Sequence, residues 1–176
     1  MIENDHELRL ALQFAQEKHR GQYRKGGKPY ITHPIAVAQD LMERGYDRVY
    51  GITALFHDLL EDTNATEEEI LEIGGPVVLK AVQRLTKPKN YVMEEYLSGI
   101  ESNPLAKFVK CADRIDNLRS CHEAPLDFQK KYYHESVRWY REFIAGTPFE
   151  TAFEAEMAQL EQRISKSLRD GASDQI

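Results

Sequence analysis

The chain has 176 residues, 41% of them hydrophobic and 10% aromatic, so it can bury an ordinary core and global disorder is not expected. Acidic residues outnumber basic ones by 29 to 23, and the net charge of -6 argues against a protein that binds nucleic acid through a basic surface. Two cysteines are too few for a disulfide framework. A membrane-spanning helix needs about 18 consecutive apolar residues, and no stretch of the chain approaches that length. We therefore expect one domain over residues 1–176 that acts in the cytoplasm, without a nucleic-acid or membrane partner.

Apolar residues recur at helical spacing along almost the whole chain, and no segment alternates as a half-buried strand would. The sequence therefore predicts an all-α fold, a compact bundle of several helices. In chain order the expected helices cover residues 5–19, 34–45, 47–60, 66–75, 76–85, 91–100, 103–120, 125–144 and 148–168, and a frayed tail is expected at 170–176.

Several of these helices begin with a recognisable capping signal. Asn4 or Asp5 can cap the first helix, and Asp47 can cap the third. Thr66 and Glu69 have the spacing of a capping box, which predicts the start of the fourth helix. These signals support the helix boundaries.

The third expected helix and the residues just after it carry four ionisable side chains in an apolar segment: His57, Asp58, Glu61 and Asp62. At roughly 100° per residue, all four fall within about 140° of the helix surface. Burying such a cluster without a counter-charge would cost several kcal/mol per ion, and a bound cation would remove that penalty. The alternative is an amphipathic helix whose polar side faces solvent.

Two other segments bear on this choice. His33 stands at the entry of a helix between apolar residues, where a histidine often serves only in the core or as a cap. Asp113 lies in the apolar middle of the seventh expected helix, where an aspartate has poor helix propensity and no capping role. A salt bridge to Arg114 or Arg119 is the alternative explanation for Asp113.

Taken together, His33, His57, Asp58 and Asp113 form a set of two histidines and two carboxylates. Mixed imidazole and carboxylate ligands suit Mn²⁺, Fe²⁺, Co²⁺ or Zn²⁺. A metal ion bound there would lower the pKa of a coordinated water and polarise a phosphoryl oxygen. The order of these residues, H…HD…D, resembles the pattern of the HD-domain phosphohydrolase superfamily, and that resemblance implies hydrolysis of a phosphoester.

Four motifs carry a resemblance to a known family. In chain order they read HRGQYRK at 19–25, PYITHP at 29–34, HDLLEDT at 57–63 and KCADRIDNL at 110–118. In this order and spacing, across about residues 5–120, the chain resembles the hydrolase domain of RelA/SpoT proteins within the HD-domain phosphohydrolase superfamily. It is too short for the synthetase and regulatory regions of the long members, so it resembles the free-standing small alarmone hydrolases. Residues 123–168 are expected to be helical and carry no recognised motif.

The resemblance implies a role for each matching residue. The implied metal ligands, with Mn²⁺ as the family's usual ion, are His33, His57, Asp58 and Asp113. Glu61 and Asp62 match the acidic pair that positions or activates the attacking water. Substrate contacts are implied for Arg24 and Lys25 at the base or phosphate, for Asn117 at the ribose, and for Ser120 beside it.

The charge pattern supports the match at Arg24 and Lys25 independently. Residues 18–39 contain five Lys or Arg and no acid, although the chain as a whole is acidic. A local positive field beside a metal would attract a multiply phosphorylated nucleotide. The alternative is a solvated basic loop.

The leading hypothesis is a metal-dependent hydrolase that removes the 3′-diphosphate of a purine alarmone, (p)ppGpp or (p)ppApp, and releases pyrophosphate. One alternative is a phosphatase acting on another 2′- or 3′-phosphorylated nucleotide such as NADPH. A second is a non-catalytic nucleotide sensor that has kept the fold. The Glu61-Asp62 pair argues against the sensor, because a sensor needs no proton shuttle.

Overall fold

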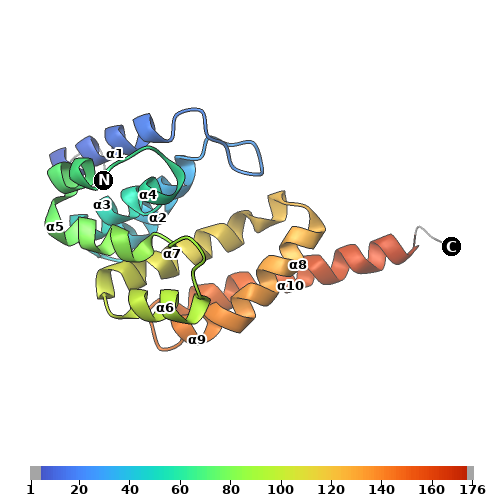
Figure 1. The fold of residues 1–176 in the computed structure, drawn as a ribbon. Helices are drawn as coiled ribbons and strands as arrows, with labels where there is room; N and C mark the ends of the chain where they lie inside the picture. Colours follow the sequence, from blue (N-terminus) through green and yellow to red (C-terminus); the bar gives the residue numbers. More distant parts are fainter. Residues whose placement is uncertain (1–4, 174–176) are drawn as a thin grey trace. The chain divides into compact units, whose positions relative to one another are not determined.

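The structure is a computed structural model that describes residues 5–173. Those residues form helices joined by loops, of which the one between α1 and α2 is long, and the only β pairing among them is an isolated antiparallel bridge between Tyr23 and Pro29 (Figure 1). The α-helices are α1 (His6–Lys18), α2 (Thr32–Glu43), α3 (Arg48–Phe56), α4 (Leu59–Asp62), α5 (Glu67–Leu85), α6 (Met93–Glu101), α7 (Pro104–Ser120), α8 (Leu126–Glu135), α9 (Arg141–Ile144) and α10 (Glu150–Ser173). The predicted all-α fold is confirmed.

The chain divides into two compact units, and the boundary falls within α7: the first unit ends at Asp113 and the second begins at Arg114. The single domain expected over residues 1–176 stays a prediction. Within residues 5–173, no helix is both long enough and apolar enough to cross a bilayer.

The centre of the first unit is α3, which packs against α1, α2 and α5 (Figure 1). Every residue of α3 from Gly51 to Phe56 is buried. A Cβ added at Gly51 would come within 2.8 Å of the Leu8 side chain and 3.3 Å of the Met42 sulfur, so the glycine permits the close approach of α1 and α2. The helix that leads into His57 is therefore held on several sides.

The third helix does not run unbroken through Leu60 as predicted. It ends at Phe56, and the single turn α4 begins after Asp58. The Nδ1 atom of His57 lies 2.6 Å from the carbonyl oxygen of Ala54, the acceptor that a continuous helix would offer to the backbone N–H of Asp58. The imidazole thus competes for the backbone acceptor at the point where the helix breaks.

The predicted boundary between the fourth and fifth helices appears as a break inside α5. Gly75 has a φ of 77° there, a conformation that favours glycine, and Pro76 follows it. The capping box is confirmed at the start of α5: the Thr66 N–H donates to Glu69 Oε2 over 2.9 Å, and the Glu69 N–H donates to Thr66 Oγ1 over 3.3 Å. Local sequence signals therefore located both features.

The second unit contains α8, α9 and α10. Its expected helix at 125–144 is divided, because a π-helical segment, η3 (Ser136–Tyr140), separates α8 from α9. The buried guanidinium of Arg114 lies there, between the rings of Tyr132 and Tyr140 at 3.8 and 3.9 Å, and its Nη2 donates to Ser136 Oγ over 2.8 Å. We attribute the widened turn to this inserted side chain.

At the two ends of the described chain, the predicted N-terminal cap is confirmed and the predicted C-terminal tail is partly helical. Asp5 caps α1, because its Oδ1 accepts from the N–H groups of Glu7 and Leu8 at 3.0 and 3.2 Å, whereas Asn4 lies outside the described residues. The last helix extends through Ser173, so the tail expected from residue 170 is helical up to that point. Residues 174–176 lie outside the described part.

Candidate metal centre

The structure brings the four predicted ligand side chains together from separate elements of the first unit. His33 comes from α2, His57 and Asp58 from the junction of α3 and α4, and Asp113 from α7. His33 Nε2 lies 3.1 Å from Asp113 Oδ1 and 3.9 Å from Asp58 Oδ2. His57 Nε2 lies 3.0 Å from Asp58 Oδ2 and 3.8 Å from Asp113 Oδ1. Each imidazole therefore faces both carboxylates.

The centre is shielded from solvent. His33, His57 and Asp113 are 1%, 2% and 4% exposed, and Asp58 is partly buried. Burial works against ionisation of Asp58, yet the neighbouring His57 imidazole holds the pKa of that carboxyl below its usual range. Burial opposes ionisation of Asp113 too, and the Lys110 ammonium and His33 hold the pKa of that carboxyl low. Both carboxylates are thus ready ligands for a cation.

The hydrogen bond of His57 determines which of its ring nitrogens can bind a metal. A backbone carbonyl only accepts, so Nδ1–H donates to Ala54, and in the neutral ring the other nitrogen carries the lone pair. That Nε2 atom is buried and makes no hydrogen bond. It faces a carboxylate oxygen of Asp58 at 3.0 Å, so two acceptor atoms meet unless a proton or a metal ion lies between them. The arrangement is typical of metal-ligating histidines, and the residues fit a divalent ion.

The alternative explanation for Asp113, a salt bridge to Arg114 or Arg119, stays a prediction. Arg114 pairs with Glu135, and Arg119 pairs with Glu156. Asp113 also pairs with Lys110, one turn earlier on α7, whose Nζ lies 2.8 Å from Oδ2.

Two residues at the centre had no predicted role: Lys110, and Tyr30, whose hydroxyl donates to Asp58 Oδ2 over 2.5 Å. For Lys110 the i,i+3 spacing was a usable signal. For Tyr30 only its place in the PYITHP motif pointed to the site.

The two acidic residues of α4, Glu61 and Asp62, contact different parts of the first unit. Asp62 Oδ2 lies 3.5 Å from the same Tyr30 hydroxyl, which places Asp62 beside Asp58. Burial raises the pKa of Asp62, and the nearby charges of Asp58 and Glu61 raise it further. Glu61 Oε2 accepts from the backbone N–H of Lys87 over 3.0 Å, just after α5. Asp62 therefore faces the centre, whereas Glu61 connects α4 to the loop that follows α5.

Arg24 and Lys25 lie in the loop between α1 and α2, which is closed by its own backbone. The Arg24 N–H donates to the carbonyl of Lys28 and the Gly27 N–H to the carbonyl of Arg24, both over 2.8 Å. Arg24 is half-buried and Lys25 is exposed. The loop can thus present two cations from an ordered backbone, and their substrate contacts stay a prediction.

Asn117 and Ser120 belong to the second unit, on the part of α7 beyond Asp113. Ser120 Oγ donates to the backbone carbonyls of Asp116 and Asn117, at 3.2 and 3.3 Å. Both residues are half-buried. Their predicted contacts with the ribose stay a prediction.

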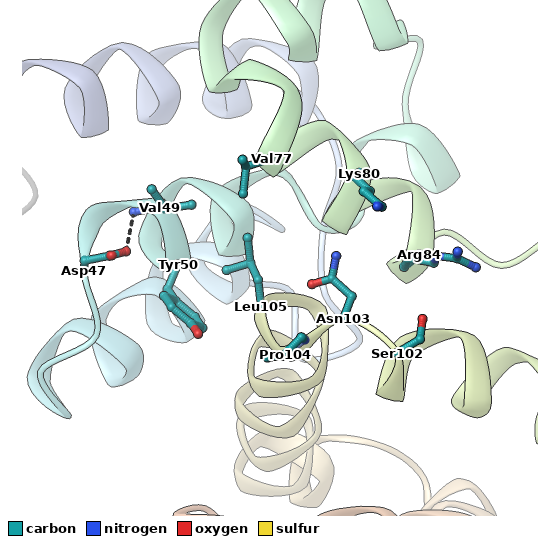
Figure 2. A pocket seen from close by; sticks show the side chains of 10 residues that line it. All are labelled: Asp47, Val49, Tyr50, Val77, Lys80, Arg84, Ser102, Asn103, Pro104 and Leu105. Carbon is teal, nitrogen blue, oxygen red and sulfur yellow. Dashed lines mark hydrogen bonds between the residues drawn. The ribbon is translucent and has the colours of Figure 1, made fainter.

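A separate hollow of about 530 Å³ lies elsewhere in the first unit, and none of the predicted site residues lines it (Figure 2). Lys80 and Arg84, one turn apart on α5, lie beside the start of α7 at one end of it, and Val77 and Leu105 lie near its apolar side. This hollow contributes nothing to the metal centre.

The all-α fold and the cluster of two histidines and two carboxylates can be compared with known protein families. The family model of the HD domain matches residues 11–103, which include His33 and the adjacent His57-Asp58 pair. The chain therefore belongs to the HD domain family. Asp113 lies beyond the matched segment.

Individual relatives narrow the class and confirm the RelA/SpoT resemblance. The chain is 39% identical over 142 residues to a guanosine-3′,5′-bis(diphosphate) 3′-pyrophosphohydrolase of Aquifex aeolicus, a match of 76% of this chain and 20% of that protein. It is 33% identical over 139 residues to a probable GTP pyrophosphokinase of Mycobacterium leprae, covering 74% of this chain and 18% of the relative. This chain thus spans about a fifth of the length of these relatives.

A solved structure resembles most of the chain. It is described as a metazoan ortholog of SpoT that hydrolyses ppGpp, and the comparison gives a TM-score of 0.76 at 27% identity. The match covers 88% of this chain and 96% of that one. The likeness therefore extends beyond the segment matched by the HD-domain model.

Proposed function

We propose that this protein is a divalent-metal-dependent hydrolase that removes the 3′-diphosphate of a purine alarmone, (p)ppGpp or (p)ppApp, and releases pyrophosphate. The observation that carries the proposal is the buried Nε2 of His57, which faces Asp58 within a set of two histidines and two carboxylates. The similarity to the Aquifex aeolicus pyrophosphohydrolase and to the metazoan SpoT ortholog supports the substrate class. We further propose that Mn²⁺ is the ion and that the protein acts in the cytoplasm.

The ion would be held by His33, His57, Asp58 and Asp113. When bound, a divalent ion supplies a lowered pKa for a coordinated water and polarises a phosphoryl oxygen. The protein prepares its ligands before binding: Ala54 fixes the tautomer of His57, and Lys110 occupies the second oxygen of Asp113. Because the ligands are already ordered, metal binding does not have to include the free-energy cost of ordering them.

Asp62 is suited to take the proton of the attacking water. It lies beside Asp58, and its pKa is raised, so the carboxylate binds a proton more readily than an exposed aspartate would. The water oxygen attacks the 3′-linked phosphorus, and the bond from that phosphorus to the 3′ oxygen breaks. The 3′ oxygen leaves as a hydroxyl after taking up a proton, and the detached diphosphate is pyrophosphate.

The basic loop is suited to bind substrate. Arg24 and Lys25 lie on an ordered loop that belongs to the same unit as the metal ligands. Two cations here would favour a nucleotide with several phosphates over one with few. We propose that they bind the base or phosphates and take no part in proton transfer.

A product assay tests the proposal. Purified protein with Mn²⁺ is offered ppGpp, ppApp and NADPH in parallel, and the products are separated by ion-exchange chromatography. We expect pyrophosphate from at least one alarmone and none from a His57→Ala, Asp58→Ala variant purified in the same way. Release of single phosphate from NADPH alone would favour the phosphatase alternative. No turnover of any compound would favour the sensor.

A further inference from the structure

The single turn α4 is held at both of its ends by side chains from the segment between α1 and α2. At its start, the Tyr30 hydroxyl donates to Asp58 Oδ2 over 2.5 Å. At its end, the Gln22 side-chain nitrogen donates to the backbone carbonyl of Asp62 over 2.6 Å. These contacts span 28 and 40 residues of sequence, so they are tertiary and not local.

His19 joins the two contacts to each other. Its ring packs against the Tyr30 ring at 4.8 Å, and its Nδ1 lies 2.7 Å from Gln22 Oε1. Because the amide nitrogen of Gln22 is used on a carbonyl, its oxygen faces His19, and Nδ1–H must donate to it. The contacts therefore form a continuous path from Asp58 through Tyr30, His19 and Gln22 to Asp62.

The protonation of these groups suits fixed hydrogen bonds. His19 is 3% exposed, and burial lowers its pKa, although the hydrogen bond to Gln22 acts in the opposite direction. Burial, together with the Asp58 carboxylate, raises the pKa of Tyr30, so the hydroxyl stays protonated and always donates.

We infer that His19, Gln22 and Tyr30, here named the α4 brace, are positioning residues that set the affinity of the centre for its divalent ion by fixing Asp58 and the turn that carries Asp62. This inference rests on the proposed metal site. A hydrogen bond to a ligating carboxylate restricts its rotation, and loss of such an outer contact typically weakens metal binding about 10–100-fold. Tyr30 supplies the only hydrogen bond to the Asp58 side chain recorded among the described residues, apart from the imidazole contacts within the centre.

The competing explanation is that the brace only stabilises the fold. In that case its loss would lower the melting temperature of the metal-free chain and leave the metal affinity of the folded fraction unchanged. The two explanations differ in a quantity that does not depend on turnover, namely the dissociation constant for Mn²⁺.

The experiment compares Tyr30→Phe with Tyr96→Phe in the full chain. The control also removes a hydroxyl that donates within the first unit, here to the carbonyl of Leu85 over 2.6 Å. Metal-free proteins are titrated with Mn²⁺ by calorimetry, and free Mn²⁺ is followed by electron paramagnetic resonance. We expect Tyr30→Phe to raise the dissociation constant for Mn²⁺ about 10–100-fold. The dissociation constant of Tyr96→Phe should stay within twofold of wild type. The melting temperature of the metal-free protein should fall by a similar amount in both variants.

A second arm tests the continuity of the brace. Gln22→Ala should weaken Mn²⁺ binding less than Tyr30→Phe, and the double variant should lose less than the product of the two single losses, because both act on one unit. Saturating Mn²⁺ should restore most of the kcat of Tyr30→Phe, which a lesion of the fold would not allow.

The outcomes separate this inference from the proposed function. Unchanged Mn²⁺ affinity in Tyr30→Phe, measured beside a wild-type chain that does bind the ion, would overturn the brace alone. A wild-type chain that binds no divalent ion would overturn both.

Discussion

His57 donates from Nδ1 to the carbonyl oxygen of Ala54, three residues earlier, over 2.6 Å. This one contact has two consequences. It takes a backbone acceptor from the helix, which breaks at this point, and it leaves Nε2 as the nitrogen that faces Asp58. The break in the helix and the orientation of a metal ligand therefore have the same local origin.

The first prediction concerns metal content. A His57→Ala, Asp58→Ala double variant should lose its divalent ion, because half of the ligand set is removed. The matched control is His6→Ala, Glu7→Ala, which removes an adjacent histidine and carboxylate from the exposed face of α1. Elemental analysis of both proteins after dialysis decides the matter, and a double variant that keeps its full complement of metal would place the site elsewhere.

The second prediction separates proton transfer from metal binding. Asp62→Asn and Glu61→Gln preserve side-chain size and remove a carboxylate, and a positioned acid or base typically contributes about 10²–10⁴-fold. Asp62→Asn should lose about that factor in kcat while its metal content stays near wild type; Glu61→Gln should lose less, because Glu61 is held by the backbone N–H of Lys87. A variant that is inactive because it lacks metal would make that residue a ligand. Full activity in both would move the proton acceptor away from α4.

The third prediction concerns the basic loop. Arg24→Ala with Lys25→Ala should raise KM more than it lowers kcat, because contacts shared by the bound substrate and the transition state are lost together. Lys80→Ala with Arg84→Ala removes the same charge from α5 and should leave KM close to wild type. Steady-state kinetics on the alarmone compares the pairs. A large fall in kcat at unchanged KM for the loop variant would refute the assignment.

The fourth prediction concerns the second unit. Arg114 is 4% exposed and donates to Glu135 and Ser136, so Arg114→Met should lower the free energy of unfolding by about 1–3 kcal/mol. Arg119→Met breaks a more exposed pair with Glu156 and should change that free energy by less than about 1 kcal/mol. Urea denaturation of both variants measures the difference. Equal effects would show that the buried guanidinium contributes no more than a surface charge.

Helix starts were predictable where the capping signal is local. Asp5, Asp47 and the Thr66–Glu69 pair act within three residues of their own helices, and the structure shows each of their hydrogen bonds. The break at His57 was not predictable from apolar periodicity; it coincides with the contact between the His57 side chain and the Ala54 carbonyl. The π-helical segment depends on Arg114 inserting from α7, a tertiary contact that spacing along 125–144 does not encode.

In the candidate site, too, some features could be predicted from the sequence and others could not. The types and order of His33, His57, Asp58 and Asp113 predicted a set of side chains that the structure brings together, and their role as metal ligands stays a prediction. The supporting residues were not named. Lys110 is one turn from Asp113, a spacing that places the two side chains on the same face of α7, whereas Arg114 and Arg119 do not have that spacing.

The most direct test of the account is the dependence of pyrophosphate release on metal loading. Metal-free wild-type protein is titrated with Mn²⁺ in the presence of ppGpp or ppApp, and the initial rate of pyrophosphate formation is plotted against ions bound per chain. The account predicts no release without metal and a rate that rises to a plateau at one bound ion, with no rise in the His57→Ala, Asp58→Ala variant. Full release from the metal-free protein, or none from either alarmone at full loading, would contradict it.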